Sequence, residues 1–517
     1  MSIAVGSFLW DTGAIGTIYG ASGLGFRPAA VFLSWSGKTQ AGSDAVPTRH
    51  NLTAGEGFLL ANGKRGCVSR YCQDNADPYQ AGGGMWESWC AVRQTDSGTA
   101  VGKLDFSAMT EDGFECVVDE AVTTGFTVFF MAVSGVEFNV VDVTEPGATG
   151  VVAYTGAGFR PTFARFYSAG KTTIDAVAGN IDEMFGAASD SAEDRQCVIA
   201  LNDMNALGYS QTNSYCRHGQ CVAFTNNDDA SAAVNCRASL NGFTDDGFEL
   251  NWLERSSTRR IKAVVASGRW YVFTDHTRNA AGAPWSNTGM TWSPEGLIVV
   301  SRIRGGTAAQ NDESADDACE ANSNNGSAIG HGYGIGPTSR LVQYHGSGGG
   351  RGTGVNIAWS WHRVDEVLLD SDGGSSYDVA LGMIDINSAF TSDTVELVQD
   401  DADPNNDSFF MLIAIGPPVI AFRQRLVRYQ HNSYQSRDAG RTLIRDVLGR
   451  TLPNHDVKPD NFLFAGGPSF ITPTKFSSLI VNPATFYLES VQPTEDRVKI
   501  ETNRESLIQS LFRRLGS

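Results

Sequence analysis

Positive charge is scarce over most of this sequence. Of its 517 residues, 39 are Lys or Arg and 57 are Asp or Glu, which gives a net charge of −18. Residues 1–416 hold 25 basic and 48 acidic residues, whereas residues 417–517 hold 14 and 9. Because nucleic-acid binding needs Lys and Arg set against phosphate, the acidic part argues against a nucleic-acid partner.

The sequence also lacks a long apolar run. The longest, SFFMLIAIGPPVIAF (408–422), is interrupted by two prolines and is too short to cross a bilayer. The opening residues, MSIAVGSFLWDTG, have neither the basic segment nor the small-residue cleavage site of a secretory signal. We therefore expect no membrane partner and a protein made in a cytoplasm.

The motifs of several enzyme classes are missing. The nucleophile elbow G-x-S-x-G, the P-loop and the zinc motif H-E-x-x-H do not occur. Nine cysteines, an odd number, argue against a required disulfide framework. The pairs Cys67/Cys72 and Cys216/Cys221 leave a zinc site open as an alternative. We favour the interpretation that the cysteines serve as small buried apolar residues. We predict no enzymatic activity, no catalytic residue, no metal ligand and no cofactor.

What the sequence does contain is repetition. An Asp followed three residues later by Glu occurs at Asp112 and Glu115, Asp246 and Glu249, and Asp393 and Glu396, each in the context of an apolar strand that ends at glycine. A second landmark lies upstream, at Pro28, Pro161 and Pro294, which are 133 residues apart. A period of this size is the length of a whole domain.

These landmarks predict three copies of one domain. We expect an N-terminal segment at 1–15, repeats at 16–150, 151–285 and 286–416, and a C-terminal arm at 417–517. The apolar runs AAVFLSW, FTVFFMAV, IKAVVA, LIVVSRI and FFMLIAI are short, rich in β-branched and aromatic residues, and bounded by turns. They predict a mainly β chain of three tandem antiparallel β-sandwich repeats, with a jelly-roll topology left open.

The repeated acids have a structural interpretation and a catalytic one. Paired carboxylates could serve a glycosidase. However, three active sites in one chain would be unusual, whereas one turn used three times is not. We therefore expect each Asp to accept backbone hydrogen bonds in an Asx-type turn.

Calcium remains a weaker alternative to the absence of metal. The stretches DSDGGSSYD (370–378) and DDADPNND (400–407) are rich in carboxylate and amide oxygens, which are calcium ligands, although neither fits an EF-hand loop.

The C-terminal arm differs from the rest of the chain. It has a positive excess, proline-spaced extended stretches, and two predicted short helices near 436–448 and 502–515, the second with a capping box at Thr502 and Glu505. We predict that the arm anchors the chain to a partner. The candidate anchor residues are Arg423, Arg425, Arg428, Leu507, Leu511, Arg513 and Arg514.

Three stretches carry a resemblance to a known family. They are GFRP (25–28 and 158–161), CVSRYCQDN (67–75) and DGFELNW (246–252). Residues 16–416 resemble a module of virion proteins of tailed bacteriophages and prophages, where such modules occur in tail-associated, fibre-like and decoration proteins. The last hundred residues are not covered by it.

The resemblance implies a non-enzymatic structural component of a tailed-phage virion, made in the bacterial host cytoplasm. It would belong to the tail, neck, baseplate or capsid decoration. Its partners would be copies of itself and other virion proteins. The alternative is a tail-fibre or spike adhesin for host surface glycans, whose rings stack on aromatic side chains. A depolymerase is the third interpretation.

Overall fold

The computed structural model describes residues 1–417 with internal gaps, together with 481–482 and 487–488. The gaps are 39–44, 50, 75, 77, 79, 96–97, 206–211, 226–233, 277–280, 283, 305–325, 349–356, 372–379, 391–392 and 401–407. The chain divides into two compact units, Met1–Pro418 and Val419–Ser517. Strands β33 (Val481–Asn482) and β34 (Tyr487–Leu488) pair in the second unit. The two helices and seven anchor residues predicted for the arm lie outside the described residues.

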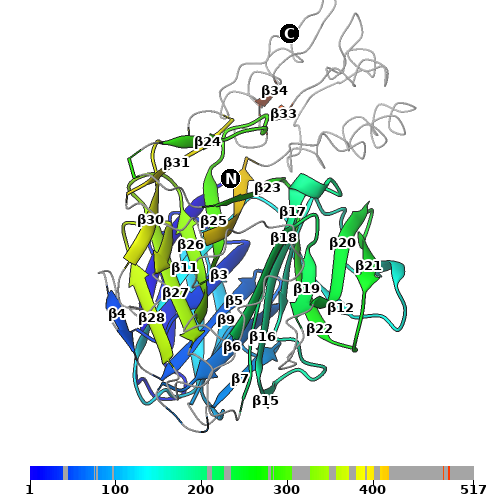
Figure 1. The fold of residues 1–517 in the computed structure, drawn as a ribbon. Coiled ribbons are helices and arrows are strands. Elements are labelled where there is room, and N and C mark those ends of the chain that lie inside the picture. The colour runs from blue at the N-terminus through cyan, green and yellow to red at the C-terminus, as the bar shows by residue number, and fades with distance from the viewer. Residues whose placement is uncertain are drawn as a thin grey trace, which may run out of the picture. The chain divides into compact units, whose positions relative to one another are not determined.

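The first unit is built from antiparallel sheets, as the sequence predicts, and its described part contains one short 3-10 helix, η1 (Glu193–Arg195). None of the described helices is long and apolar enough to cross a membrane. The strands fall into three sets, each with one large and one small sheet (Figure 1).

The first set opens the chain. Its large sheet has the order β1 (Ile3–Trp10), β11 (Phe126–Val133), β3 (Ala30–Trp35), β5 (Leu52–Leu60), β6 (Arg65–Cys72) and β7 (Ala81–Trp86). Its small sheet has the order β2 (Ile18–Ala21), β10 (Gly113–Glu120), β9 (Ala100–Thr110) and β8 (Ala91–Gln94).

The second set has the same order. The large sheet runs β12 (Phe138–Thr144), β22 (Arg260–Ala266), β14 (Phe163–Ser168), β16 (Ile181–Ala188), β17 (Gln196–Asp203) and β18 (Thr212–His218). The small sheet runs β13 (Gly150–Thr155), β21 (Gly247–Glu254), β20 (Val234–Thr244) and β19 (Val222–Thr225).

The third set repeats the order again. The large sheet runs β23 (Arg269–His276), β32 (Ser408–Gly416), β25 (Gly296–Arg304), β26 (Gly326–Gly334), β27 (Arg340–Gly348) and β28 (Ile357–Arg363). The small sheet runs β24 (Trp285–Asn287), β31 (Val395–Gln399), β30 (Ala380–Ile386) and β29 (Leu368–Ser371). Strand β12 pairs with β22 of the second set, and β23 pairs with β32 of the third, although they precede the predicted repeat starts at residues 151 and 286.

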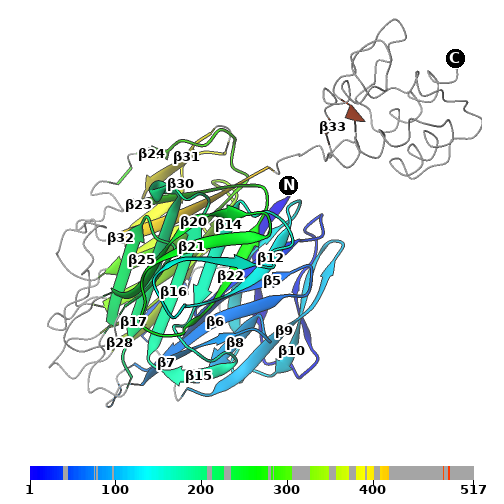
Figure 2. The same cartoon turned by 90° about the vertical axis from the view of Figure 1, so that its right-hand side faces the viewer.

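Two strands leave their own set. β15 (Ala176–Gly179), which lies in the chain between β14 and β16, pairs with β7 of the first set (Figure 2). β4 (Ala45–Arg49), which lies between β3 and β5, pairs with β28 of the third set. The corresponding segment of the third set, 305–325, lies outside the described residues.

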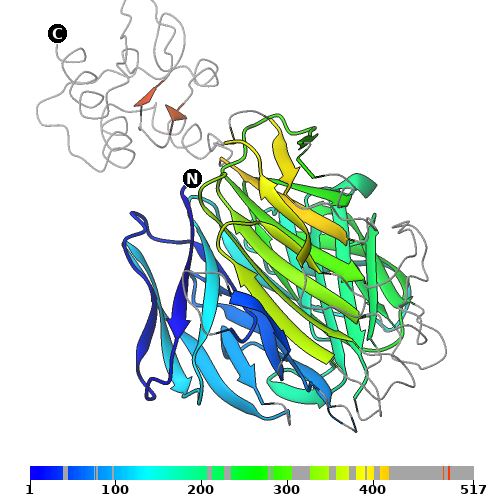
Figure 3. The ribbon, with the colours of Figure 1, turned by 60° about the vertical axis from the view of Figure 1, so that its left-hand side comes forward.

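The apolar runs are continuous because the large sheets are buried on both faces. Along β32, Met411 and Ile413 join a core shared by the three large sheets, whereas Leu412 and Ala414 face the small sheet of the same set. Strand β11 divides in the same way. The shared core brings the three sets together, and Figure 3 shows the first set in blue beside the third in yellow-green. The small sheets are covered on one face only, so β10, β21 and β31 alternate between buried and more exposed residues.

Candidate functional site

The three landmark prolines stand at the entrance to the large sheets. Pro28, Pro161 and Pro294 are all buried, and each shortly precedes the strand that pairs with the last strand of its set. Proline suits such a buried bend because its φ is fixed and it has no N–H to satisfy.

The landmark aspartates accept backbone hydrogen bonds, from a loop distant in sequence. Asp112 accepts from Gly23 N at 2.9 Å and from Gly25 N at 2.5 Å. Asp246 accepts from Gly156 N at 3.2 Å and from Gly158 N at 2.6 Å. All four glycines have a positive φ, which places their N–H groups around the carboxylate. In the first and second sets, the two landmarks are therefore connected through these loops. Asp393 is exposed, and no hydrogen bond joins it to another residue in the described part of the chain.

The landmark glutamates lie half-buried on the small sheets. Glu249 accepts from Asn241 Nδ2 at 2.8 Å, and Glu396 accepts from Asn387 Nδ2 at 2.8 Å. Hydrogen bonds from Asn387 and Ser388 lower the pKa of Glu396. Glu115 occupies the corresponding place on β10, where it pairs with Ala108.

Charged side chains that the sequence analysis did not single out meet inside the shared core. Glu56 on β5 and Arg165 on β14 are fully buried, and a guanidinium nitrogen of Arg165 donates to Glu56 Oε1. The Nδ1 atom of His331, on β26, lies 3.2 Å from Glu56 Oε2. One residue from each of the three large sheets thus contributes to the first cluster.

A second cluster also draws on all three large sheets. Arg70 on β6 forms an ion pair with Glu183 on β16, with 3.2 Å between Nη1 and Oε2. A second nitrogen of Arg70 donates to the backbone carbonyl of His345, on β27, at 2.8 Å. The rings of His331 and His345 stack with centroids 5.7 Å apart, which connects the two clusters.

Burial shifts the pKa values of the histidines and the glutamates of this central network. Burial, and then the positive charge nearby, holds the pKa of His331 and of His345 well below the ordinary range, so both imidazoles are neutral. Burial raises the pKa of Glu56 to about 7 against the attraction of Arg165. Burial also raises the pKa of Glu183 against the attraction of Arg70. Each carboxylate nevertheless has its own guanidinium.

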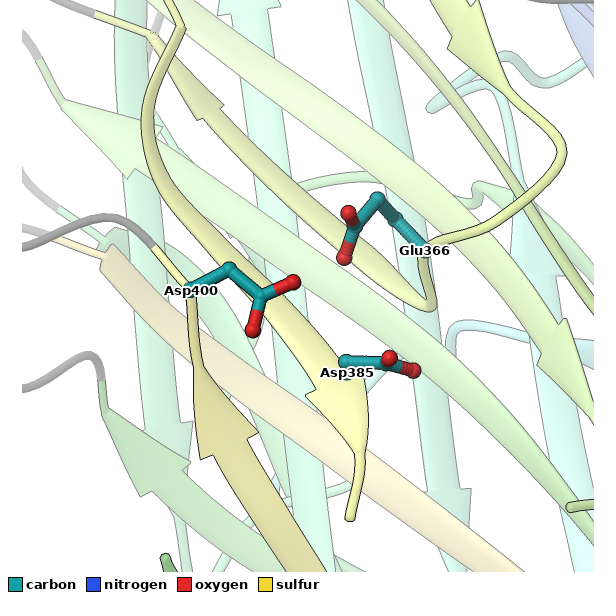
Figure 4. Close-up of side chains that lie close together, drawn as sticks. All are labelled: Glu366, Asp385 and Asp400. Atoms are coloured by element: carbon teal, nitrogen blue, oxygen red, sulfur yellow. The ribbon is translucent and has the colours of Figure 1, made fainter. Parts of the chain in front are cut away.

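A different arrangement of acids lies in the third set. Glu366 belongs to the connection between β28 and β29, Asp385 to β30, and Asp400 follows β31. One oxygen of each lies within 4.8 Å of the others (Figure 4). The main chain fixes these positions, because Val367 N donates to Ile384 O at 3.1 Å and Asp400 N donates to Met383 O at 2.8 Å.

The acidic cluster of Glu366, Asp385 and Asp400 is only partly neutralised. The Arg340 guanidinium contacts both carboxylate oxygens of Asp385. Glu366 is 4% exposed, and its Oε2 atom is buried without a hydrogen-bond partner. Burial, with the charges of Asp400, Asp385 and Asp365, raises the pKa of Glu366 to about 8. Burial raises that of Asp385 to about 6 even beside Arg340.

One residue of the two stretches that could bind calcium belongs to this acidic cluster. Asp400 begins the stretch DDADPNND, while residues 401–407 and 372–378 lie outside the described residues. Glu366 and Asp385 carry no local pattern that would have indicated them. The core charges had one signal, because single charged residues interrupt apolar strands at Glu56, Arg70 and Arg165. All eight described cysteines are buried.

A comparison of this chain with protein-family models and with curated proteins gives no match.

Proposed function

We propose that the protein is a non-enzymatic structural component of a tailed-phage virion, built of three copies of one antiparallel β-sandwich and anchored by residues 417–517. The repeated strand order supports the three copies. It also favours boundaries at the first strand of each set, so that the modules begin near Ile3, Phe138 and Arg269. The sandwich character rests on three separate cores, each between a large sheet and its small sheet.

The single observation that carries this proposal is the interlocking of the three sets. Strands β15 and β4 each complete a sheet of another set, and both core clusters take residues from all three large sheets. Buried ion pairs are costly to form, and removing one partner leaves an uncompensated buried charge. They therefore favour one arrangement of the three sets. A body of this kind suits a role in which a fixed surface contacts neighbouring subunits.

Truncation tests the anchoring role. The chain ending at residue 417 removes the second compact unit, so it should keep its β-rich circular dichroism and its cooperative unfolding. We expect this variant to be missing from phage or prophage particles that incorporate the full chain, as measured by mass spectrometry of purified particles. Normal incorporation of the truncated chain would refute the anchor. Absence of the full chain from all purified phage or prophage particles made in the presence of this protein would refute the virion proposal itself.

The glycan-binding alternative gains no support from the described surface. Stacking on sugar needs exposed aromatic rings. The exposed large hydrophobic side chains of the described residues are all aliphatic: Leu9, Ile15, Ile18, Val151 and Leu253. Binding of the full chain to host glycans on an array would reverse this ranking.

A further inference from the structure

The acidic cluster has a counterpart in the first set that the strand registers define. An added Cβ on Gly332 would lie 1.9 Å from Val367 O, and one on Gly57 would lie 2.0 Å from Cys90 O. These matching close contacts align Val367 with Cys90, and therefore Glu366 with Trp89. Asp119 and Asp400 lie at the same distance after the landmark Asp of their own set, so they correspond to one another. Val117 and Val398 correspond in the same way. Because Val117 pairs with Asp105 and Val398 with Asp385, Asp105 corresponds to Asp385.

Half of the arrangement is the same in the two sets. Arg65 forms an ion pair with Asp105, as Arg340 does with Asp385. The Nε atom of Arg65 donates to Ser88 O at 3.0 Å, and that of Arg340 donates to the corresponding carbonyl, that of Asp365. This half of the site is therefore a structural element common to both copies.

The other half differs in the chemistry of one residue. In the first set, Trp89 Nε1 donates to Asp119 Oδ2 at 2.8 Å, and the Lys103 ammonium lies 4.5 Å from the centre of the indole ring. In the third set, Glu366 takes the place of Trp89. A donor to the aspartate is thereby replaced by a second carboxyl group, which is buried and unpartnered.

The second set confirms that the acids are not needed to build this part of the fold. The corresponding residues there are Gln220, Ser239 and Leu253, none of them charged. Gln220 Oε1 accepts from the Tyr215 hydroxyl at 3.1 Å, so in the second set this oxygen has a hydrogen-bond donor within the chain.

The net negative charge around the acidic cluster is equal in size and opposite in sign to the charge of a divalent cation. Four carboxyl groups gather there, from Asp365, Glu366, Asp385 and Asp400. Two cations oppose them: Arg340 on Asp385, and Arg363, whose Nε lies 3.2 Å from Asp365 Oδ1. When ionised, the group keeps an excess of two negative charges, which centres on Glu366 and Asp400.

We propose that Glu366, Asp385 and Asp400 bind a divalent cation, and that the site favours Ca²⁺. The donors are all carboxylate oxygens, which suit Ca²⁺, Mg²⁺ or Mn²⁺ rather than the softer metals. Calcium binds oxygen at about 2.3–2.6 Å, so two of its ligands can be about 4.8 Å apart, and the three oxygens meet this limit. Magnesium requires a tighter octahedron and gives up its water reluctantly.

The three ligands are not equivalent. Asp385 already receives the Arg340 guanidinium and the Ile386 N–H, so it has the least capacity left for a metal. Figure 4 shows the carboxylates of Glu366 and Asp400 turned toward one another, and these two form the main pair. Water would fill the remaining positions, since calcium takes six to eight ligands.

Calorimetric titration of the chelator-treated full chain with CaCl₂ tests this site. We expect binding that Glu366→Gln and Asp400→Asn each weaken at least ten-fold, while Asp119→Asn, the matched control in the first set, leaves the affinity unchanged. Titration with MgCl₂ should give weaker binding. The weakest protein calcium sites have a Kd of about 10⁻³ M, so titration to about 10 mM covers the range.

A second variant separates loss of the ligand from loss of the fold. Glu366→Trp restores the side chain of the first set and should abolish calcium binding while Asp400 gains an indole donor, with circular dichroism unchanged. The proposal is overturned if the wild-type chain binds no calcium to about 10 mM, or if the Glu366 and Asp400 variants bind as tightly as wild type. Neither result depends on where the chain lies in a particle, so this test is independent of the proposed function.

Discussion

The central network and the acidic cluster handle buried charge in opposite ways. In the centre, Glu56 has Arg165 and Glu183 has Arg70, each pair joining different sheets. In the third set, the buried Glu366 has carboxylates for its nearest charged neighbours. A desolvated charge is tolerated only with a counter-charge. The first region has one guanidinium for each carboxylate, whereas in the second Arg340 and Arg363 oppose only two of four carboxyl groups. This contrast is the reason for treating the centre as structure and the cluster as a binding site.

The largest expected effect comes from removing one partner of a buried ion pair in the central network. Arg165→Met leaves Glu56 buried without its partner, and we expect a loss of about 3–5 kcal/mol in the free energy of unfolding. Adding Glu56→Gln should recover a large part of the loss, because an amide carries neither a charge to be buried nor the cost of neutralising one. Urea unfolding of the full chain, followed by circular dichroism, measures both. A double variant as unstable as the single one would contradict the pairing argument.

The pH dependence of stability sharpens the same comparison. The pKa of Glu56 rises from 4.5 in the unfolded chain to about 7 when folded. The folded state therefore holds the proton more tightly, so this stabilisation is complete below pH 4.5 and is lost as the pH rises through 7. The loss amounts to about 3 kcal/mol. The groups around Glu56 are Arg165, Glu183, His331, Tyr167 and Tyr333.

Glu56→Gln removes this contribution. We expect the difference in unfolding free energy between wild type and Glu56→Gln to change by about 3 kcal/mol between pH 4.5 and pH 8, with the variant faring relatively better at the higher pH. Parallel curves for the two proteins would show that Glu56 titrates normally.

A smaller effect is expected from crowding the backbone beside the acidic cluster. Gly332→Ala places a methyl group 1.9 Å from Val367 O, next to Glu366, so β26 and the β28–β29 connection must separate. We expect a loss of about 1–3 kcal/mol, as in overpacked cores. Gly147→Ala is the control, since its methyl group meets nothing within 4 Å. Equal stability of the two variants, measured by thermal unfolding, would remove the close contact from the argument.

The smallest effect tests the two corresponding aspartates in calcium-free buffer. Asp119→Ala removes the acceptor of the Trp89 indole and should cost up to about 1 kcal/mol. Asp400→Ala removes a charge from an acidic cluster and should be neutral or stabilising by a few tenths of a kcal/mol, roughly the size of exposed charge effects. The expected result, measured by chemical unfolding, is a loss of stability for Asp119→Ala and none for Asp400→Ala. Losses of equal size would remove the distinction between the two sets.

Much of the fold could be predicted from the sequence. The runs at 30–35, 126–133 and 408–416 are strands as predicted, because β-branched and aromatic residues buried on both faces leave a continuous apolar pattern. The predicted repeat boundaries at 151 and 286 separate β12 and β23 from the sheets in which they pair. Both strands precede the landmarks from which the period was measured. The arrangement of sets around one core depends on contacts between segments far apart in sequence, for which the period carries no signal.

The sites were much less predictable. Asp112 and Asp246 were recognised as acceptors, but their partners are glycines more than 80 residues earlier in the chain. Asp400 was noticed within an acidic stretch, whereas Glu366 and Asp385 come from separate elements. A lone carboxylate in a sequence gives no indication of the side chains that will surround it.

The sequence by itself determined that the described part of this chain is built of antiparallel strands, within a thrice-repeated sequence pattern, because backbone period and side-chain burial act over a few residues. The tertiary structure alone decided which charges meet. Coulombic and desolvation energies depend on distance in space, and the folded chain brings Glu56 to Arg165, and Glu366 to Asp385 and Asp400, across 19 to 109 positions of sequence.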